Sequence, residues 1–225
     1  EKTNLEKIVI IKSTSSVRDF IIIWCESMDK KPEIILLGAG GHCRSCIDVV
    51  ESEGRFTVAG IGDRIDGGDS SSVLGYPILG TDADLPELRK QYAFALVTVG
   101  QIRTSAVRRR LFDELKELGY ELPTIISPHA YVSAHAQVGA GSIIMHHALV
   151  NAGASVGENC IINSKALIEH DVRVGADCHI STGAIINGGV DVGAGTFFGS
   201  NAVSVQEISI PAGSFVKAGH LERGK

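Results

Sequence analysis

The chain has 225 residues, a formal net charge of −5 and 26 glycines, and only 5% of its residues are aromatic. This length suits one large or two small domains, each with a buried core. The acidic balance argues against nucleic acid as a partner, because phosphate backbones bind basic surfaces. No apolar run approaches the roughly 18 residues that a membrane-spanning helix needs, so we expect no membrane span. Five cysteines, an odd number, do not suggest a disulfide scaffold, which favours a cytoplasmic protein.

Residues 1–32 hold two short apolar bursts around a patch of serine and threonine and do not match a signal peptide. We predict a weakly ordered extension there. From residue 33 to residue 127, strand-like apolar runs alternate with helix-like amphipathic segments, which predicts a small parallel α/β sheet. The expected strands are 33–38, 56–61 and 93–100, with a further short element at 76–80. One expected helix follows the first strand and ends at residue 53, and two others cover residues 82–91 and 103–118. A loop is expected at 64–72, and residues 124–126 would close the unit.

A glycine-rich turn follows the first strand, where residues 38–42 read Gly-Ala-Gly-Gly-His. Backbone N–H groups at a helix N-terminus bind phosphate, so this turn suits a nucleotide, although a tight turn without a ligand is the alternative. Cys43 replaces the third glycine of a dinucleotide fingerprint, which disfavours a nicotinamide cofactor. Asp63 ends the second strand, where this topology presents an acceptor to a ribose or base. The predicted substrate-binding residues are Gly38, Gly40, Gly41, His42 and Asp63.

An aliphatic or aromatic residue recurs every six positions over residues 130–199, with a small or short-branched residue two positions before each. Neither the 3.6-residue period of a helix nor the 2-residue period of a half-buried strand explains this rule, which predicts a solenoid of short strands. Val-Gly pairs recur at positions 138/139, 156/157, 174/175 and 192/193, so three hexads make one coil. The register falters at Ser204, which predicts a loop near residues 205–207 and a last partial coil.

The three-hexad coil places a histidine beneath a glycine. His170 follows the inward-facing Ile168 by two positions and belongs at an outward-facing corner, and Gly188 stacks directly above it. An imidazole can take a proton from an amine or hydroxyl near neutral pH, and the Gly188 N–H can stabilise an oxyanion. Asp171 or Glu169 can hold the imidazole, and we favour Asp171. A solvated surface histidine is the alternative interpretation.

The remaining cysteines and histidines give weaker signals. Cys160 and Cys178 take the small inward position of successive coils and should stack in the core. The Cys-x-x-Cys motif at residues 43–46 has no second pair to complete a zinc site. His146 and His147 are lower-ranked candidates that would face a neighbouring subunit. No histidine lies five residues after His170, as the zinc site of some β-helix carbonic anhydrases would need, so we predict no metal.

The motifs at residues 38–42, at 62–63 (Gly-Asp) and at 168–171 (Ile-Glu-His-Asp), together with the hexads, resemble one family. It is the hexapeptide-repeat sugar acyltransferases of the bacillosamine and perosamine N-acetyltransferase and sialic acid O-acetyltransferase type. The resemblance covers about residues 33–219. It implies an α/β N-terminal Rossmann-like domain over 33–127, followed by a left-handed parallel β-helix over 128–225.

The resemblance implies an acetyl-CoA-dependent N-acetyltransferase that modifies the amino group of a nucleotide-linked amino-dideoxy sugar in surface glycan biosynthesis. The enzyme would be a homotrimer with acetyl-CoA between adjacent β-helices and the nucleotide-sugar on the N-terminal domain. His170 would be the general base and Asp171 its partner, while His179 matches a family histidine near the acetyl donor. A sialic acid O-acetyltransferase and a non-catalytic trimeric nucleotide-sugar-binding scaffold are the alternatives. The implied catalytic residues are His170, Asp171 and Gly188, and the implied acetyl-CoA-binding residues are His179, Gly188 and Asn163.

Overall fold

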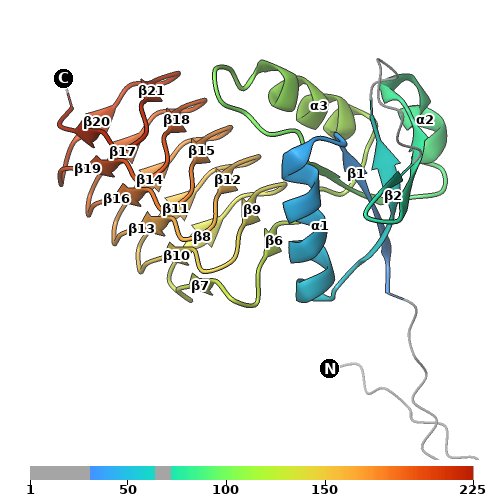
Figure 1. Cartoon of the computed structure of the whole chain (residues 1–225), viewed down its shortest axis with the longest axis horizontal. Helices are drawn as coiled ribbons and strands as arrows, with labels where there is room; N and C mark the ends of the chain where they lie inside the picture. Colours follow the sequence, from blue (N-terminus) through green and yellow to red (C-terminus); the bar gives the residue numbers. More distant parts are fainter. Residues whose placement is uncertain (1–30, 64–71, 225) are drawn as a thin grey trace, which may run out of the picture. The chain divides into compact units, whose positions relative to one another are not determined.

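The computed structural model describes residues 31–63 and 72–224. Residues 1–30 of the expected extension and residues 64–71 of the expected loop lie outside the described residues. Residues 31–225 belong to one unit, in which an α/β domain precedes a parallel β-helix (Figure 1). This confirms the predicted fold class, an α/β domain followed by a left-handed parallel β-helix.

The α/β domain is built on a five-stranded sheet with the strand order β3-β4-β2-β1-β5. All its strand pairs are parallel except β3 with β4, which is antiparallel. Leu74 and Gly75, at φ 49° and 87°, form the tight turn between those two strands, which suits a hairpin. Its elements are β1 (Glu33–Leu37), α1 (Gly41–Glu53), β2 (Thr57–Gly62), β3 (Ser72–Val73), β4 (Tyr76–Gly80), the 3₁₀ helix η1 (Asp82–Asp84), α2 (Leu85–Leu88), β5 (Phe94–Val97) and α3 (Ala106–Glu117).

The third helix buries a different stripe from the one that its apolar residues suggest. The buried residues of α3 follow the i, i+3, i+4, i+7 pattern that puts them on one face, and they are Arg108, Leu111, Phe112 and Leu115. The spacing of the apolar residues in the sequence predicts that one face of this helix holds Val107, Leu111, Leu115 and Leu118, but Val107 is 41% exposed. The prediction was wrong there because the first position of the stripe is an arginine, whose charge conceals it in a hydrophobicity pattern.

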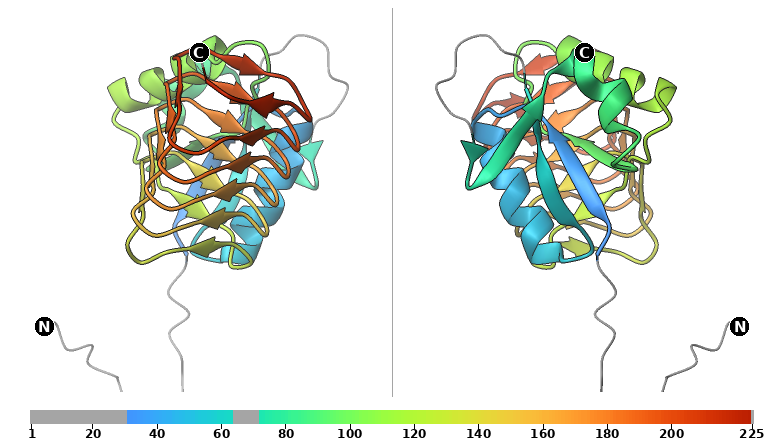
Figure 2. Two further views of the ribbon diagram at one scale, coloured as in Figure 1. Left: turned by 90° about the vertical axis from the view of Figure 1, so that its left-hand side faces the viewer. Right: turned by 90° about the vertical axis from the view of Figure 1, so that its right-hand side faces the viewer.

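Seventeen two-residue strands form the three parallel sheets of the β-helix, which Figure 2 shows from both ends of the long axis. Strands that pair are three hexads apart, as in Val150↔Ile168 and Ile168↔Ile186, so the predicted coil length is confirmed. The strands are β6 (Ile125–Ile126), β7 (Tyr131–Val132), β8 (Gln137–Val138), β9 (Ile143–Ile144), β10 (Leu149–Val150), β11 (Ser155–Val156), β12 (Ile161–Ile162), β13 (Leu167–Ile168), β14 (Arg173–Val174), β15 (His179–Ile180), β16 (Ile185–Ile186), β17 (Asp191–Val192), β18 (Phe197–Phe198), β19 (Val203–Ser204), β20 (Ser209–Ile210), β21 (Phe215–Val216) and β22 (Leu221–Glu222).

The hexad register fills the β-helix with the predicted side chains. The aliphatic members and the small residues before them form one buried cluster, which includes Cys160 and Cys178 at 0% exposure, as predicted. The repeated Val-Gly step has a steric cause, because a Cβ at Gly139 would lie 2.6 Å from the backbone nitrogen of Glu158 in the next coil. Glycine at this corner therefore lets successive coils approach closely.

Two predictions at the ends of the solenoid were wrong. Residues 124–126 do not close the α/β unit, because β6 pairs with β9 and so forms the first strand of the β-helix. Ser204 does not start a loop, because its hydroxyl accepts a hydrogen bond from the Asn187 N–H at 2.9 Å and it is fully buried in β19. None of the helices in the described part of the chain has the length and apolar character that crossing a membrane requires.

Candidate active site

His170 lies on the corner after β13 and is held by the next residue. Its Nδ1 is 2.9 Å from Oδ2 of Asp171, whose backbone adopts a left-handed conformation with φ 60°. A carboxylate can only accept, so Nδ1 carries the proton and Nε2 is the unprotonated nitrogen of the neutral ring. The hydrogen bond to Asp171 raises the pKa of His170, and the charges of Asp171 and Glu169 add to this effect. The ring is exposed to solvent, as predicted for a corner position.

Gly188 lies against the imidazole of His170. A Cβ at position 188 would be 2.7 Å from both Nε2 and Cε1 of that ring. The neighbouring Gly189 donates its N–H to the His170 carbonyl at 3.1 Å and so joins the two coils. Among residues 31–63 and 72–224 the Gly188 N–H meets no acceptor. The structure thus brings His170, Asp171 and Gly188 together.

The second carboxylate of this corner supports the backbone. Glu169 accepts the His170 N–H at 3.1 Å and the Asn151 side-chain amide at 2.8 Å through the same oxygen, Oε2. Of the two carboxylates, Asp171 is the one that bonds to the ring, which agrees with our preference for it over Glu169. Gly153 makes room for that carboxylate, because a Cβ there would lie 2.5 Å from Asp171 Oδ1.

His179 is buried where the α/β domain meets the β-helix. Only 7% of it is exposed, and burial is the main cause that lowers its pKa to about 4. Its Nδ1 is 2.6 Å from the Gln101 carbonyl oxygen, and its Nε2 is 3.1 Å from Asn163 Nδ2. His179 and Asn163, which the resemblance implies as two of the acetyl-CoA-binding residues, are therefore in direct contact. Phe197 packs edge-on against the imidazole with ring centroids 5.2 Å apart.

The glycine turn brings His42 to the same region. The His42 ring centroid is 6.4 Å from that of His179, and burial, helped by the charge of Arg108, lowers the pKa of His42 to about 3. Its Nε2 is buried and has no partner in the described part of the chain. Gly40 is the N-cap of α1, and Cβ atoms at Gly40 and Gly41 would meet nothing within 4 Å. The first turn of α1 is therefore open to a ligand.

Gly38 and Asp63 complete the turn. Gly38 has φ +108°, and its Cβ would lie 2.5 Å from the Val99 side chain, so glycine is required here for packing. Asp63 directly follows β2 and donates its N–H to the Gly80 carbonyl at 3.0 Å. In residues 31–63 and 72–224, no hydrogen bond or ring contact connects the predicted substrate-binding residues of the glycine turn with His170, Asp171 or Gly188.

Comparison with known proteins agrees with this geometry. Residues 33–115 match the sequence family described as the PglD N-terminal domain. The acetyltransferase domain of PglB from Neisseria gonorrhoeae in complex with acetyl coenzyme A is 32% identical, with 84% of this chain and 89% of that chain covered and a TM-score of 0.76. The chain belongs to the bacillosamine and perosamine type of hexapeptide-repeat acetyltransferases. It is therefore an acetyltransferase.

Other structures support this family. A histidine-to-asparagine mutant of perosamine N-acetyltransferase from Caulobacter crescentus, in complex with CoA and GDP-perosamine, is 32% identical; 86% of this acetyltransferase and 89% of that chain are covered, with a TM-score of 0.80. WeeI from Acinetobacter baumannii, at 19% identity, 84% and 94% coverage and a TM-score of 0.65, shows the shared fold alone. A comparison with curated protein sequences found no match.

Two residues of the acetyltransferase escaped the sequence-based prediction. Gln101, after β5, bonds to His179 through its carbonyl, and a backbone contact leaves no mark in a sequence. Arg108 is 1% exposed, and its guanidinium donates to backbone carbonyls, among them those of Val97 at 2.6 Å and Asn159 at 3.0 Å. It occupies the first position of the buried stripe of α3, where its charge conceals it in a hydrophobicity pattern.

Two other clusters are structural. His146 bonds to Ser127 Oγ and to Asp48 of α1, both at 2.7 Å, so it joins α1 to the first coils.

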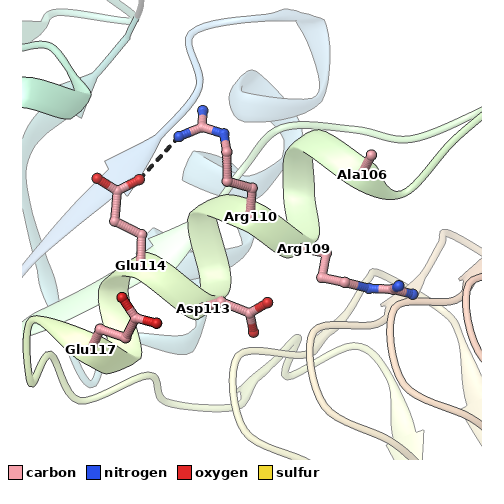
Figure 3. A pocket seen from close by; sticks show the side chains of 6 residues that line it. All are labelled: Ala106, Arg109, Arg110, Asp113, Glu114 and Glu117. Atoms are coloured by element: carbon pink, nitrogen blue, oxygen red, sulfur yellow. Dashed lines mark hydrogen bonds and ion pairs between the residues drawn. The ribbon is translucent and has the colours of Figure 1, made fainter.

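The outer face of α3 carries a hollow lined by mostly charged residues (Figure 3). There Arg110 pairs with Glu114 at 3.0 Å, while Arg109 points toward the β-helix and pairs with Asp177 at 2.8 Å. The lining residues are Ala106, Arg109, Arg110, Asp113, Glu114 and Glu117, and none belongs to the predicted site.

Proposed function

We propose that this chain is an acetyl-CoA-dependent N-acetyltransferase that acts on the amino group of a nucleotide-linked amino-dideoxy sugar. The substrate class is a UDP- or GDP-4-amino-4,6-dideoxy sugar, used in surface glycan biosynthesis in the cytoplasm. The observation that carries the proposal is the His170–Asp171 pair lying against Gly188. Complexes of relatives with acetyl-CoA, or with CoA and GDP-perosamine, support the same chemistry.

His170 is the general base in this proposal. The substrate amine attacks the thioester carbon and must lose a proton as the new C–N bond forms, and His170 Nε2 accepts that proton. Asp171 accepts the Nδ1–H, keeps Nε2 unprotonated before the reaction and stabilises the imidazolium afterwards. The raised pKa of His170 increases its basicity. The C–S bond then breaks, and CoA leaves with a proton returned from His170.

Gly188 is the oxyanion donor in the proposed mechanism. Negative charge develops on the former thioester oxygen as the amine adds, and a fixed backbone N–H directed at that position stabilises it. The Gly188 N–H has no acceptor among the described residues. Glycine also leaves room for the imidazole, because no Cβ fills the space beside the ring.

The nucleotide part of the substrate is assigned to the α/β domain. Gly40 and Gly41 present backbone N–H groups at the start of α1 with open space around them, which suits a diphosphate. His42 and Asp63 flank this turn at the carboxyl ends of β1 and β2, where ligands bind in open α/β sheets. Gly38 shapes the turn through its positive φ.

An apolar stripe on the β-helix supports the homotrimer. It consists of the outward residues of one sheet, β7-β10-β13-β16-β19-β22, and Tyr131 and Leu221 at its ends are 59% and 43% exposed. The His170 corner follows β13 and so borders the stripe. We assign this face to contact with other copies of the chain, which would place donor groups of one subunit beside His170 of the next. The stripe residues are Tyr131, Leu149, Leu167, Ile185, Val203 and Leu221.

A panel of acceptors tests the proposal. Purified protein is mixed with acetyl-CoA and with UDP- and GDP-4-amino-4,6-dideoxy sugars, and the acetylated product is followed by mass spectrometry together with thiol release. We expect turnover with at least one of these amino sugars. Turnover with sialic acid hydroxyls alone would favour the O-acetyltransferase, and nucleotide-sugar binding without any turnover would favour the scaffold. Either result rejects the proposal.

A further inference from the structure

One hydrogen-bonded step between coils, next to the His170 corner, is built differently from the others. In the preceding coil of this sheet the residue after the strand, Glu169, donates its backbone N–H to the Ile186 carbonyl at 3.0 Å. Asn187 instead donates its N–H to the Ser204 hydroxyl at 2.9 Å, and its side-chain Nδ2 donates to the Ser204 carbonyl at 2.6 Å. Within the described β-helix, Asn187 alone makes this exchange among the residues that follow a strand and pair with a further coil.

The fold itself does not require this exchanged step. Ser204 takes the inward position that Ile168 and Ile186 hold in the two preceding coils, and it is fully buried. A buried hydroxyl is unfavourable unless it is hydrogen-bonded, whereas an aliphatic side chain would add apolar contacts and leave the ordinary step in place. The pairing of β16 with β19 is also shorter than that of β13 with β16, because only Ile185 pairs with Val203. The serine therefore does not serve the packing of the β-helix.

The exchanged step fixes the residue that precedes Gly188. The corner at residues 163–166, for example, is closed by a bond from the N–H of its fourth residue to the carbonyl of its first, at 3.0 Å. In the described part of the chain no such bond closes the corner at residues 187–190. The two bonds to Ser204 therefore set the backbone at Asn187, and with it the peptide group that carries the Gly188 N–H.

We infer that Ser204 and the Asn187 side chain are positioning residues, which hold the Gly188 N–H in the direction that the oxyanion of the reaction requires. The inference rests on the proposed function, in which Gly188 donates to the former thioester oxygen. A backbone donor is effective only when it already points at the place where charge develops. A misplacement of ~1 Å costs on the order of 10²-fold in rate, so the orientation of this one peptide group matters to the reaction.

Two substitutions of the same shape separate the hydroxyl of Ser204 from the volume of its side chain. Ser204→Thr keeps the acceptor for the Asn187 N–H, whereas Ser204→Val replaces it with a methyl group and restores the aliphatic register. Thiol release at saturating acetyl-CoA and amino sugar measures kcat, and calorimetry measures acetyl-CoA affinity. We expect Ser204→Thr to keep kcat within about threefold and Ser204→Val to lose about tenfold or more. Acetyl-CoA affinity should not change, and the valine variant should melt no lower than the threonine variant.

A pH profile and a control variant distinguish positioning from a merely structural role. In Ser204→Val the acidic limb of the kcat/KM profile should stay at the wild-type pH, because His170 keeps its partner Asp171. A shifted limb would mean that the serine acts through the base, and would overturn the inference. Thr196→Val is the matched control, since Thr196 is another fully buried residue whose hydroxyl bonds to a backbone carbonyl, that of Gly193 at 2.7 Å, at a different corner. Its kcat should equal that of the wild type, and a loss as large as that of Ser204→Val would overturn the inference.

A double-mutant cycle tests whether the two side chains act together. Asn187→Ala should lower kcat by a factor similar to that of Ser204→Val, and the double variant should be no slower than the slower single variant; additive losses would overturn the inference. Equal kcat values in Ser204→Thr and Ser204→Val of an active enzyme would reject the inference alone. Turnover with a hydroxyl acceptor only, with the expected difference between these two variants, would reject the proposed function alone. Absence of turnover with any acceptor would reject both.

Discussion

Replacing Gly188 with alanine perturbs the proposed base without removing it. The new Cβ would lie 2.7 Å from Nε2 and Cε1 of His170 and 3.3 Å from Nδ1. Carbon atoms in contact are at least ~3.5 Å apart, so the imidazole must move by about 0.8 Å, the difference between 3.5 and 2.7. Gly188 does not have the positive φ that disfavours other residues, so alanine fits its backbone. The effect should therefore be confined to the exposed ring of His170.

The magnitude follows from this displacement. Misplacing a reacting group by ~1 Å costs on the order of 10²-fold in rate, so we expect kcat of Gly188→Ala to fall by about 10². The free energy of unfolding should change by less than about 1 kcal/mol, because a compatible Gly-to-Ala change acts mostly on the unfolded chain.

Thiol release from acetyl-CoA at saturating acceptor measures kcat, and urea unfolding measures stability. His170→Ala and the double variant with Gly188→Ala complete the experiment, since the alanine should cost nothing further once the imidazole is gone. A Gly188→Ala enzyme with the wild-type kcat would refute the reasoning. An equal further loss in the His170→Ala background would show that the methyl group acts on something other than the ring.

Three further perturbations test separate parts of the structure. Asp171→Asn removes the main cause that raises the pKa of His170. Because the base must be deprotonated to act, the acidic limb of the kcat/KM profile should move to lower pH, and the plateau should fall about tenfold or more. An acidic limb at the wild-type pH would contradict the pairing of His170 with Asp171. Arg108→Met removes the donors to the carbonyls of Val97 and Asn159 and should lower the free energy of unfolding by about 2–4 kcal/mol, measured by urea titration. An unchanged urea midpoint would show that the hydrogen bonds of Arg108 do not stabilise the fold. Leu167→Glu puts a charge in the centre of the apolar stripe and should yield monomers in light scattering, whereas an intact trimer would place the interface elsewhere.

The repeat could be predicted from sequence because one rule, a small residue and then a large apolar one in every six positions, applies to each coil. The rule failed at Ser204, since a buried hydroxyl that bonds to the Asn187 N–H replaces an apolar side chain without breaking the strand. Residues 124–126 follow the same rule, because Thr124 and Ile126 lie six positions before Ala130 and Val132, and the pairing of β6 with β9 places them in the β-helix. The prediction that they close the α/β unit started the repeat one hexad too late, whereas hydrophobic periodicity contains no signal for the buried Ser204.

Stacking by three hexads predicted that Gly188 lies against His170, because both belong to the repeat. The contact between Gln101 and His179 was beyond such reasoning, since it joins a loop of one domain to a strand of another through a backbone carbonyl. Arg108 was missed for a related reason: its hydrogen-bond partners are carbonyls of three separate segments, and only the folded chain brings them together.

The proposed role of His170 is the central claim, and the kcat of His170→Ala tests it most directly. The variant and the wild type are compared at saturating acetyl-CoA and amino-sugar acceptor, with calorimetry to check that both still bind acetyl-CoA. The proposed mechanism predicts that kcat falls by roughly 10²-fold or more while acetyl-CoA affinity is unchanged. A variant that retains the wild-type kcat would contradict it, because the proton of the attacking amine would then have another acceptor.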